Sequence, residues 1–494
     1  MSDANRRVRL VGLGAIVLFL VLFAQLNYLQ VFHAQALDNN PLNTRGVLEE
    51  FEQPRGAIIS GDGVTLAQSV PSHDQYKYQR VYPEGSLFGQ LTGYFSFTYG
   101  TDGLEKEYNS VLTQTQAPSL PSSLQQLKNF FTNQPAPDNI QLTVLTSLQK
   151  LAQQELAGRD GAVVAVQPKT GAVLAMYSNP PLDPTPLASH DQSVEEKAWA
   201  ALQTAPGNPL LSAAYRQRYF PGSTFKVITS AAVYDHDPSL ASKYFPVVSG
   251  FVLPQTAGQV LHNFGGEACG GQMLELFTVS CDTGYAQLGL DVGGGALAGE
   301  AHAFGWDQVP PIDLPGVAES YFPPAASFQH DLPALAKSAI GQESVQATPL
   351  TMALDAAAIA DGGVIMTPHL LAKVTGTEGQ TVTAYHPTQW LRATSASTAA
   401  KMTKLMLSVV NSPNGTGVLA RVPGVEVAGK TGTAQTGGPY IETWFVAFAP
   451  ANNPQIALAV LVENQPPADE YQGGTIAAPI AKAMIESYLS RGGA

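Results

Sequence analysis

The sequence predicts an α+β protein with one apolar helix near its amino terminus. Three observations predict this class: an unbroken apolar run at 10–24, strand-like segments on both sides of a helical middle, and a helical segment at 477–488. Strands that are split around helices, with a terminal helix left to cover the sheet, are typical of a sheet with helices on both faces.

The composition excludes several classes of protein. With 494 residues, 45% of them apolar, the chain is long enough for two or three domains and too apolar to be disordered. Its 26 Lys and Arg residues against 39 Asp and Glu residues give a net charge of −13, which argues against nucleic acid as a partner because phosphate contacts need cations. Two cysteines, and nine histidines without ligand pairs at helical spacing, predict no metal site.

The amino-terminal segment is predicted to cross a membrane once. Residues 1–9 carry three arginines, and 10–32 are mainly apolar, which at about 1.5 Å per residue is enough to span a hydrocarbon core of about 30 Å. The positive-inside rule then keeps 1–9 in the cytoplasm and places the rest of the chain outside. A cleaved signal peptide is the alternative, since Ala-Gln-Ala at 34–36 has the form of a cleavage site. The span is long for a signal peptide, and a buried core helix fits less well because no polar face interrupts 10–24.

The region after the anchor is rich in turns, and a Pro-, Gln- and Ser-rich stretch at 114–139 is typical of a linker. A helix is predicted next, opened by a capping box of Thr146 and Gln149 and ended by Gly158. We place a domain boundary there. The predicted segments are a cytoplasmic tail at 1–9, the anchor at 10–32, a first outer domain at 33–157 and a second outer domain at 158–494.

The second outer domain is predicted to begin with a β-hairpin formed by 161–166 and 172–177. Helical patterns follow at 351–360 and 395–410. The carboxyl-terminal part is predicted as three strands and a helix, at 425–434, 443–449, 455–463 and 477–488.

Three short motifs carry the candidate chemistry. The first is Ser223-Thr224-Phe225-Lys226, which follows Pro221-Gly222 and opens an apolar helical run. A serine at the start of a helix meets backbone N–H groups and a helix dipole that favour a developing negative charge. Because Lys226 lies one turn further on the same face, we expect its amine to reach the Ser223 hydroxyl and, when buried, to act as a neutral base.

The other two motifs follow in order along the chain. Ser280-Cys281-Asp282 supplies a second hydroxyl, and Lys430-Thr431-Gly432-Thr433 lies in a predicted strand. Each motif alone is weak, since Ser147-Leu148-Gln149-Lys150 and Lys169-Thr170-Gly171 repeat two of the spacings in other contexts. The order of the motifs and the Pro-Gly before the first one make the set informative.

Together the motifs predict an acyl-transfer site for substrates that end in a carboxylate. Ser223 is the expected nucleophile and Lys226 its base, while Ser280 relays a proton to the leaving amine. Backbone N–H groups of Ser223 and Thr433 are the expected oxyanion hole, and the substrate peptide is expected to lie beside the strand of the third motif. The residues expected to bind substrate are Lys430, Thr431, Gly432 and Thr433.

The motif set resembles that of the class B penicillin-binding proteins, which are membrane-anchored transpeptidases of peptidoglycan synthesis. The likeness covers nearly the whole chain, and in length and in the style of its first outer domain the chain is most similar to the actinobacterial penicillin-binding protein A group. Further signatures of the family are Arg55-Gly56-Ala57-Ile58, Gly103-Leu104-Glu105, Pro168-Lys169-Thr170-Gly171 and Gly341-Gln342 with Thr348-Pro349-Leu350.

The resemblance implies both a fold and an activity. The fold is an elongated, mainly β and irregular pedestal of the dimerisation type at 33–157, then a transpeptidase domain at 158–494 with an antiparallel sheet, helices on both faces and an all-helical subdomain. The activity is that of a D,D-transpeptidase, in which Ser223 takes the acyl group of a stem peptide ending in D-Ala-D-Ala, releases D-Ala and passes the acyl group to a neighbouring amine. β-Lactams are expected to trap the same serine. The implied partners are glycan-polymerising proteins and the division or elongation machinery of the membrane, and no cofactor is implied.

One catalytic position departs from the family pattern, because the second motif ends in Asp282 where the family has Asn. An ionised Asp only accepts hydrogen bonds, and a carboxylate near Lys226 favours the protonated lysine, which opposes its role as base. We expect slow but genuine catalysis. A catalytically weak penicillin-binding scaffold is the alternative that Asp282 favours, while a D,D-carboxypeptidase or β-lactamase-like hydrolase shares the site but has no need of a long pedestal.

The two cysteines lie close together in the sequence, Cys281 inside the second motif and Cys269 upstream of it. In an oxidising exterior, an even number of cysteines predicts a disulfide, which would pin the loop that carries Ser280. The alternative is a pair of small buried thiols that pack as apolar side chains.

Overall fold

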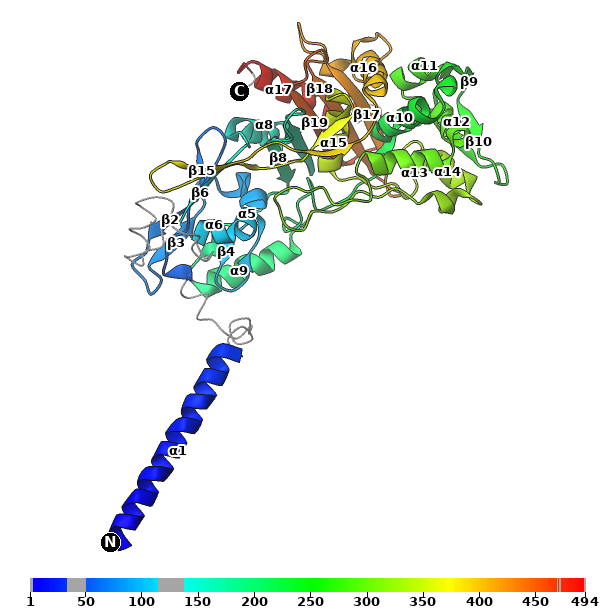
Figure 1. The fold of residues 1–494 in the computed structure, drawn as a ribbon. Helices are drawn as coiled ribbons and strands as arrows, with labels where there is room; N and C mark the ends of the chain where they lie inside the picture. Colours follow the sequence, from blue (N-terminus) through cyan, green and yellow to red (C-terminus); the bar gives the residue numbers. More distant parts are fainter. Residues whose placement is uncertain (1–2, 33–49, 114–136, 469, 471, 493–494) are drawn as a thin grey trace. The chain divides into compact units, whose positions relative to one another are not determined.

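The computed structural model describes residues 3–32, 50–113, 137–468, 470 and 472–492 (Figure 1). The chain divides into two compact units, Met1–Pro54 with Val70–Gln79, and Arg55–Ser69 with Arg80–Ala494. The sequence at 34–36 and most of the predicted linker lie outside the described residues. The domain boundaries predicted at residues 33 and 158 remain predictions.

The first unit contains helix α1 (Asp3–Phe32), which includes the predicted anchor. Its segment Arg6–Tyr28 has a mean hydropathy of 2.3 and is long and apolar enough to cross a membrane. The apolar side chains of this segment are exposed, as expected for a helix that contacts lipid instead of protein. The predicted apolar amino-terminal helix is therefore confirmed.

The second unit is built around a five-stranded antiparallel sheet with the strand order β17-β18-β19-β7-β8. Residues 456–462 are all buried, and because successive side chains of a strand point to opposite faces, both faces of the sheet are covered. The α+β prediction is confirmed. The strands are β7 (Gly161–Val166), β8 (Val173–Asn179), β17 (Ala428–Gln435), β18 (Ile441–Ala449) and β19 (Ile456–Gln465).

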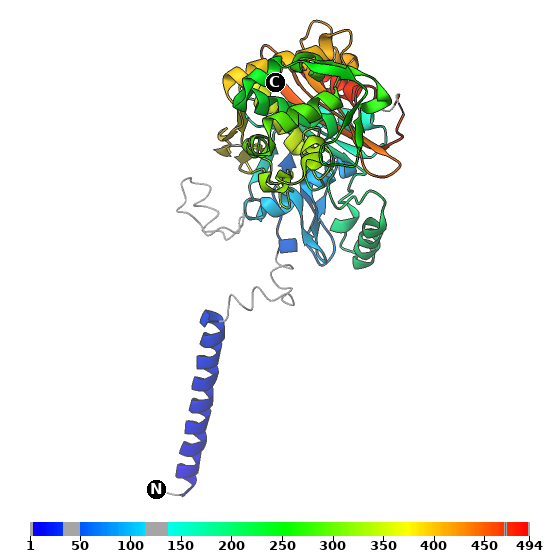
Figure 2. The same ribbon diagram turned by 90° about the vertical axis from the view of Figure 1, so that its right-hand side faces the viewer.

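Helices cover this sheet and extend beyond its β17 edge. Helix α15 (Pro349–Ala360) packs on β7, β18 and β19, α16 (Ala396–Asn411) packs on β17, and α17 (Ala477–Leu489) packs on β18, β19 and α8 (Thr146–Leu156). A further group of helices lies beside β17 in Figure 1 and faces the viewer in Figure 2. These helices are α10 (Lys226–His236), α11 (Met273–Thr278), α12 (Asp282–Val292), α13 (Gly294–Ala303) and α14 (Leu332–Ser338).

The helical group also contains two short antiparallel ribbons. Strand β9 (Phe245–Val248) pairs with β12 (Cys269–Gly271), and β10 (Gly250–Val252) pairs with β11 (Val260–His262). The resemblance implied an all-helical subdomain, so these ribbons are an addition to it. One of them carries Cys269, which places the ribbon next to the second motif.

A second, six-stranded sheet has the order β15-β14-β6-β1-β2-β3. Strands β14 (Leu371–Thr375) and β15 (Thr381–Ala384) belong to the second predicted outer domain, 158–494, whereas the other four strands belong to the first, 33–157. Strand β14 joins the two sets, because Val374 pairs opposite Ile140. Local patterns do not reveal a strand that pairs over so long a separation. The remaining strands are β1 (Ile58–Ile59), β2 (Thr65–Pro71), β3 (Tyr78–Val81) and β6 (Asn139–Leu142).

The remaining α-helices and strands of the described residues lie between these elements. Those before residue 137 are α4 (Gly89–Thr92), β4 (Phe95–Ser96), β5 (Gly100–Thr101), α5 (Gly103–Glu107) and α6 (Asn109–Thr113). The later ones are α9 (Gln192–Thr204), β13 (Val364–Met366) and β16 (Gln389–Arg392).

The capping box predicted for α8 is wrong. The N-cap residue is Leu145, and the acceptor for the first helical N–H groups is the carboxylate of Asp62, which accepts from Thr146 N at 3.0 Å. Gln149 instead bonds the edge strand β8 through both N–H and C=O of Met176, at 2.9 and 2.8 Å. A cap supplied from a distant turn leaves no local signature in the helix sequence.

The two signatures of the first outer domain meet in a buried ion cluster. The carboxylate of Glu105 accepts from Arg55 at 2.9 Å and from Arg80 at 2.6 Å, and all three side chains are at most 1% exposed. Burial by itself raises the pKa of Glu105, but the two guanidinium groups outweigh it and lower the pKa below its ordinary value. Since a buried charge is tolerated only with partners, this cluster fixes the signatures to one another.

Candidate active site

Ser223 lies in a tight turn, Gly222–Phe225, directly before helix α10. Gly222 has φ +52°, and a Cβ at this position would lie 2.7 Å from the carbonyl oxygen of Thr433. The N–H of Gly222 donates to Gly341 O at 3.0 Å. The turn is therefore held against strand β17 on one side and the Gly341 loop on the other, and only glycine fits at position 222.

Lys226 is fully buried, and its amine contacts the second motif. Lys226 Nζ donates to Asp282 Oδ1 at 2.7 Å, to Ser280 O at 2.8 Å and to Ser280 Oγ at 3.3 Å. Ser223 Oγ donates to the same Asp282 Oδ1 at 3.4 Å. In the described part of the chain, the predicted hydrogen bond between Lys226 and Ser223 is thus replaced by a shared carboxylate oxygen.

Ser280 lies in the turn between α11 and α12, where it has φ +59°. A non-glycine residue in this left-handed region is uncommon and is frequent at functional sites. The N–H of Cys281 donates to Leu276 O at 2.8 Å, which holds the turn. The Ser280 hydroxyl accepts from Lys430 Nζ at 2.7 Å, so that one oxygen contacts both lysines.

The third motif lies in β17, which is the edge strand of the five-stranded sheet. Lys430 is fully buried and also donates to Thr431 O at 3.0 Å. The hydroxyl of Thr431 bonds Thr416 Oγ1 at 2.6 Å, and Thr433 Oγ1 accepts from Gly473 N at 3.4 Å. A Cβ on Gly432 would lie 2.8 Å from Pro221 O, so this glycine lets the strand approach the turn of the nucleophile.

The electrostatics of the two lysines follow from their burial. Burial lowers the pKa of Lys226 below its ordinary value, although the carboxylate of Asp282 opposes this shift. Burial and the nearby charge of Lys226 together lower the pKa of Lys430 well below its ordinary value. The lowered pKa of Lys226 increases the share of its amine that is neutral at a given pH, and the neutral form is the one that can accept a proton.

Two family models match this chain. The model described as penicillin binding protein transpeptidase domain matches residues 161–486, which include all three motifs. The chain belongs to the penicillin-binding protein family. A second model, described as penicillin binding protein A dimerisation domain, matches residues 55–139. The predicted likeness to the penicillin-binding protein A group is confirmed.

Relatives of this penicillin-binding protein match over nearly its whole length. Peptidoglycan D,D-transpeptidase PbpA of Mycolicibacterium smegmatis is 37% identical over 99% of this chain and 100% of its own. The crystal structure of PBPA from Mycobacterium tuberculosis has a TM-score of 0.79 and 36% identity, and the match covers 89% of this chain and 100% of that one. The penicillin G acyl-enzyme complex of penicillin-binding protein A from M. tuberculosis has a TM-score of 0.78 at the same identity, over 88% of this chain and 100% of that one.

The structure joins Cys269 of β12 to Cys281 by a disulfide in this penicillin-binding protein. Cys281 lies between Ser280 and Asp282, so the bond fixes the second motif to a neighbouring ribbon. We expect the double substitution Cys269→Ser with Cys281→Ser to lower the free energy of unfolding by about 3 kcal/mol, because a closed loop of this length restricts the unfolded chain by roughly that amount. Denaturant unfolding of both proteins measures the difference.

The control for this prediction measures whether Cys269 and Cys281 are oxidised in the wild-type protein. Alkylation of the unreduced, denatured protein followed by intact mass measurement is expected to add nothing, and alkylation after reduction is expected to modify both cysteines. Two alkylated cysteines in the unreduced protein would contradict the disulfide.

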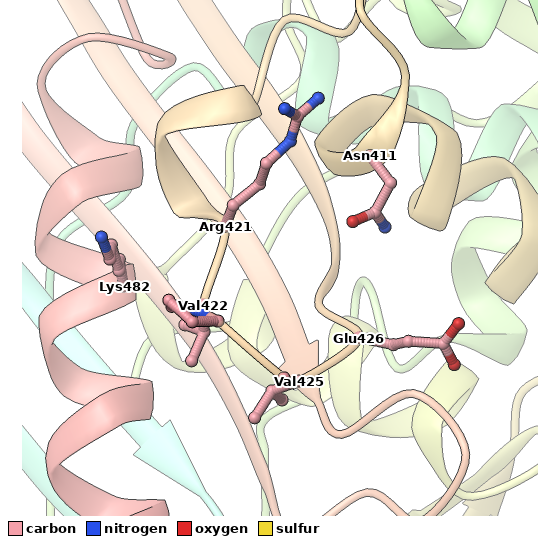
Figure 3. A pocket seen from close by; sticks show the side chains of 8 residues that line it. Asn411, Arg421, Val422, Val425, Glu426 and Lys482 are labelled. Atoms are coloured by element: carbon pink, nitrogen blue, oxygen red, sulfur yellow. The ribbon is translucent and has the colours of Figure 1, made fainter.

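A separate cavity of about 440 Å³ lies among the end of α16, the 421–426 loop and α17, and Figure 3 shows Lys482 of α17 across from Glu426. None of the residues predicted for catalysis or substrate binding lines it. The lining residues are Asn411, Arg421, Val422, Pro423, Gly424, Val425, Glu426 and Lys482.

Sequence reasoning missed two contacts of the site. Thr416 bonds the hydroxyl of Thr431, and the N–H of Phe264 donates to Asp282 Oδ2 at 3.2 Å. Gly415 and Gly417 flank Thr416, and a Cβ on Gly415 would lie 2.2 Å from Val409 O. This pair of glycines is a weak signal of a tightly packed loop, whereas no pattern in the sequence marks Phe264.

Proposed function

We propose that this protein is a peptidoglycan D,D-transpeptidase that works through an acyl-enzyme on Ser223. The observation that carries the proposal is the chain of hydrogen bonds from Ser223 Oγ to Asp282, Lys226, Ser280 and Lys430. Support comes from relatives that are named as peptidoglycan D,D-transpeptidases and from an M. tuberculosis relative that forms an acyl-enzyme with penicillin G.

In the acylation step, Ser223 Oγ attacks the carbonyl carbon of the penultimate D-Ala of a stem peptide. Its proton is taken up by the neutral amine of Lys226, which is held close to Ser223 because both groups bond the same Asp282 oxygen. The bond to the terminal D-Ala nitrogen breaks, and this leaving amine takes a proton from the Ser280 hydroxyl, which Lys226 replaces. An amine of a neighbouring stem then attacks the ester carbonyl and forms the new amide bond, the bond to Ser223 Oγ breaks, and the proton lost by the amine passes by way of Lys226 to Ser223 Oγ.

The substrate carboxylate is held by the third motif in this proposal. Lys430 supplies a buried amine whose charged form the arriving carboxylate favours, Thr433 supplies a hydroxyl, and the edge of β17 accepts the peptide as an added strand. The backbone N–H groups of Ser223 and Thr433 form the oxyanion hole. Thr431 acts through Thr416, to which its hydroxyl is bonded.

The location of the protein is also a proposal. We infer that α1 crosses the membrane with 1–9 in the cytoplasm, because arginines precede its apolar stretch. The catalytic domain is then outside the cytoplasm, where peptidoglycan is assembled. Glycan-polymerising membrane proteins and the division or elongation machinery are the proposed partners of the chain.

The test of this function is turnover of a stem peptide that ends in D-Ala-D-Ala by the full-length protein, with and without an amine acceptor. We expect D-Ala release and a cross-linked product of matching amount, both lost in Ser223→Ala. Release of D-Ala without product would point to a D,D-carboxypeptidase. Absence of both release and penicillin labelling would point to a scaffold.

Asp282→Asn is expected to raise the acylation rate at neutral pH, by roughly three- to tenfold. The amide keeps the acceptor for Phe264 N but removes the charge 2.7 Å from Lys226, so the pKa of Lys226 falls further and more of its amine is neutral. Stopped-flow acylation by a β-lactam across pH measures both the rate and the shift of its acid limb to lower pH. An unchanged rate and profile would show that the carboxylate does not restrain Lys226.

A further inference from the structure

Of the two buried lysines of the site, Lys226 pairs with a carboxylate, whereas Lys430 contacts none among the described residues. Lys226 and Lys430 both have no exposed surface, and Asp282 pairs with Lys226 at 2.7 Å. The polar contacts of Lys430 Nζ are the Ser280 hydroxyl and Thr431 O, both of which are uncharged. For either lysine to carry its charge in this buried site before the substrate carboxylate arrives, a further source of stabilisation is needed besides the one carboxylate.

An aromatic ring lies beneath each of these ammonium groups. Lys226 Nζ lies over the ring of Tyr285 at 5.3 Å from its centroid, and Lys430 Nζ lies over the ring of Phe277 at 5.5 Å. The two rings are 6.2 Å apart, and both are fully buried. The negative face of an aromatic ring attracts a cation, most strongly where water is excluded.

The chain holds these rings in place from several sides. Phe277 belongs to α11 and Tyr285 to α12, so they flank the turn of Ser280. The Tyr285 hydroxyl is 2.6 Å from Ser230 Oγ, which in turn donates to Lys226 O at 2.7 Å. Ring, hydroxyl and lysine backbone are thereby connected, and Tyr285 cannot rotate without losing a buried hydrogen bond.

We propose that Phe277 and Tyr285 are positioning residues for the reaction, each of which holds one lysine ammonium group over its ring face and so sets how readily that lysine carries charge. The inference rests on the proposed function. Tyr285 tunes the base, Lys226, and Phe277 favours the positively charged form of Lys430, which binds the substrate carboxylate. The charged groups that face Lys226 from other elements are Asp282 of α12 and Lys430 of β17.

The test lowers the electron density on the ring face at one position while nearly keeping the shape of the ring. Phenylalanine and its mono-, di- and trifluorinated forms are incorporated at position 285 of the full-length protein, and acylation by a fluorescent penicillin is followed from acid to alkaline pH. We expect each added fluorine to move the acid limb to lower pH, by about one unit in total for three fluorines, because a weaker ring face stabilises the Lys226 ammonium less.

The same fluorination series is made at position 277, where the native residue is already phenylalanine. This series tests the inference even if Tyr285→Phe does not fold. Here the expected change is a three- to tenfold rise in the penicillin concentration that gives half-maximal acylation, with a smaller effect on the limiting rate, because Lys430 binds the carboxylate. The matched control is trifluorophenylalanine at Phe304, a fully buried ring that lies under neither lysine.

The outcomes separate the inference from the function on which it rests. A wild-type protein that is not labelled at Ser223 overturns the proposed function and removes the premise of the inference. A wild-type protein that is labelled, with pH profiles and half-maximal concentrations that do not change along both fluorination series, overturns the inference alone. Graded shifts at 285 and 277, with none at 304, support it.

Discussion

Replacing Lys226 with methionine is expected to lower the rate of Ser223 acylation by about 10²- to 10⁴-fold, which is the usual contribution of a positioned general base. Methionine has nearly the same length and suits a buried site, but it has no amine to take the proton of Ser223. Lys226→Arg is expected to fail as well, since a guanidinium keeps the charge but does not deprotonate. Rates of penicillin acylation measure both variants.

The chain offers a matched control for this prediction. Ser147-Leu148-Gln149-Lys150 repeats the spacing of the first motif, but Lys150 is half exposed and pairs with Glu84 at 3.0 Å on the surface. Lys150→Met is expected to leave acylation unchanged. Equal rates for wild type and Lys226→Met would contradict the role of Lys226 as base.

The pH dependence of the wild-type protein follows from the same residue. Acylation needs the neutral amine, so the rate rises as pH passes through the pKa of Lys226. Burial lowers this pKa below the ordinary lysine value of 10.5, and Asp282 limits the shift. The midpoint of the rise is therefore expected below pH 10.5, and it should move with Asp282→Asn and not with Lys150→Met.

The second large effect is on stability. Glu105→Gln is expected to lower the free energy of unfolding by about 3–5 kcal/mol. The substitution leaves the guanidinium groups of Arg55 and Arg80 buried without their shared carboxylate. Chemical unfolding measures the loss. The control is Glu52→Gln, which breaks an exposed pair with Lys77 and is expected to cost no more than about 1 kcal/mol. Similar losses in both variants would contradict this account of the cluster.

The stability that this cluster contributes is expected to depend on pH, because the pKa of Glu105 is lower in the folded protein than in the unfolded chain. The folded pKa of Glu105 is lowered, so its contribution is present above the unfolded value and is lost as pH falls through the folded value. Wild-type protein is therefore expected to lose stability in acid, and Glu105→Gln is expected to lose less over the same range.

The elements that the sequence predicted well are those with a strong local pattern. The hairpin of β7 and β8, the three strands β17, β18 and β19, and the closing helix α17 agree with the predictions to within a few residues at their ends. Each has a continuous apolar or alternating pattern over its own length. The motifs also lie together as their order along the chain suggested.

The parts that the sequence did not predict depend on contacts between distant residues. Asp62 caps α8 from another turn. Strand β14 pairs with β6, although much of the transpeptidase region lies between them in the sequence. In the site, the oxygen shared by Ser223 and Lys226 belongs to Asp282, and its position depends on the strained turn at Ser280. A pattern of residue types in sequence order carries no information on such geometry, which packing determines.

The measurement that tests the central claim most directly is the site of penicillin attachment. Full-length protein is labelled with a fluorescent penicillin and digested, and the modified peptide is identified by mass spectrometry. We predict one adduct on the peptide that contains Ser223, lost in Ser223→Ala and retained in Ser147→Ala. An adduct on another residue, or no adduct in the folded wild-type protein, would contradict the assignment of Ser223 as the acylated nucleophile.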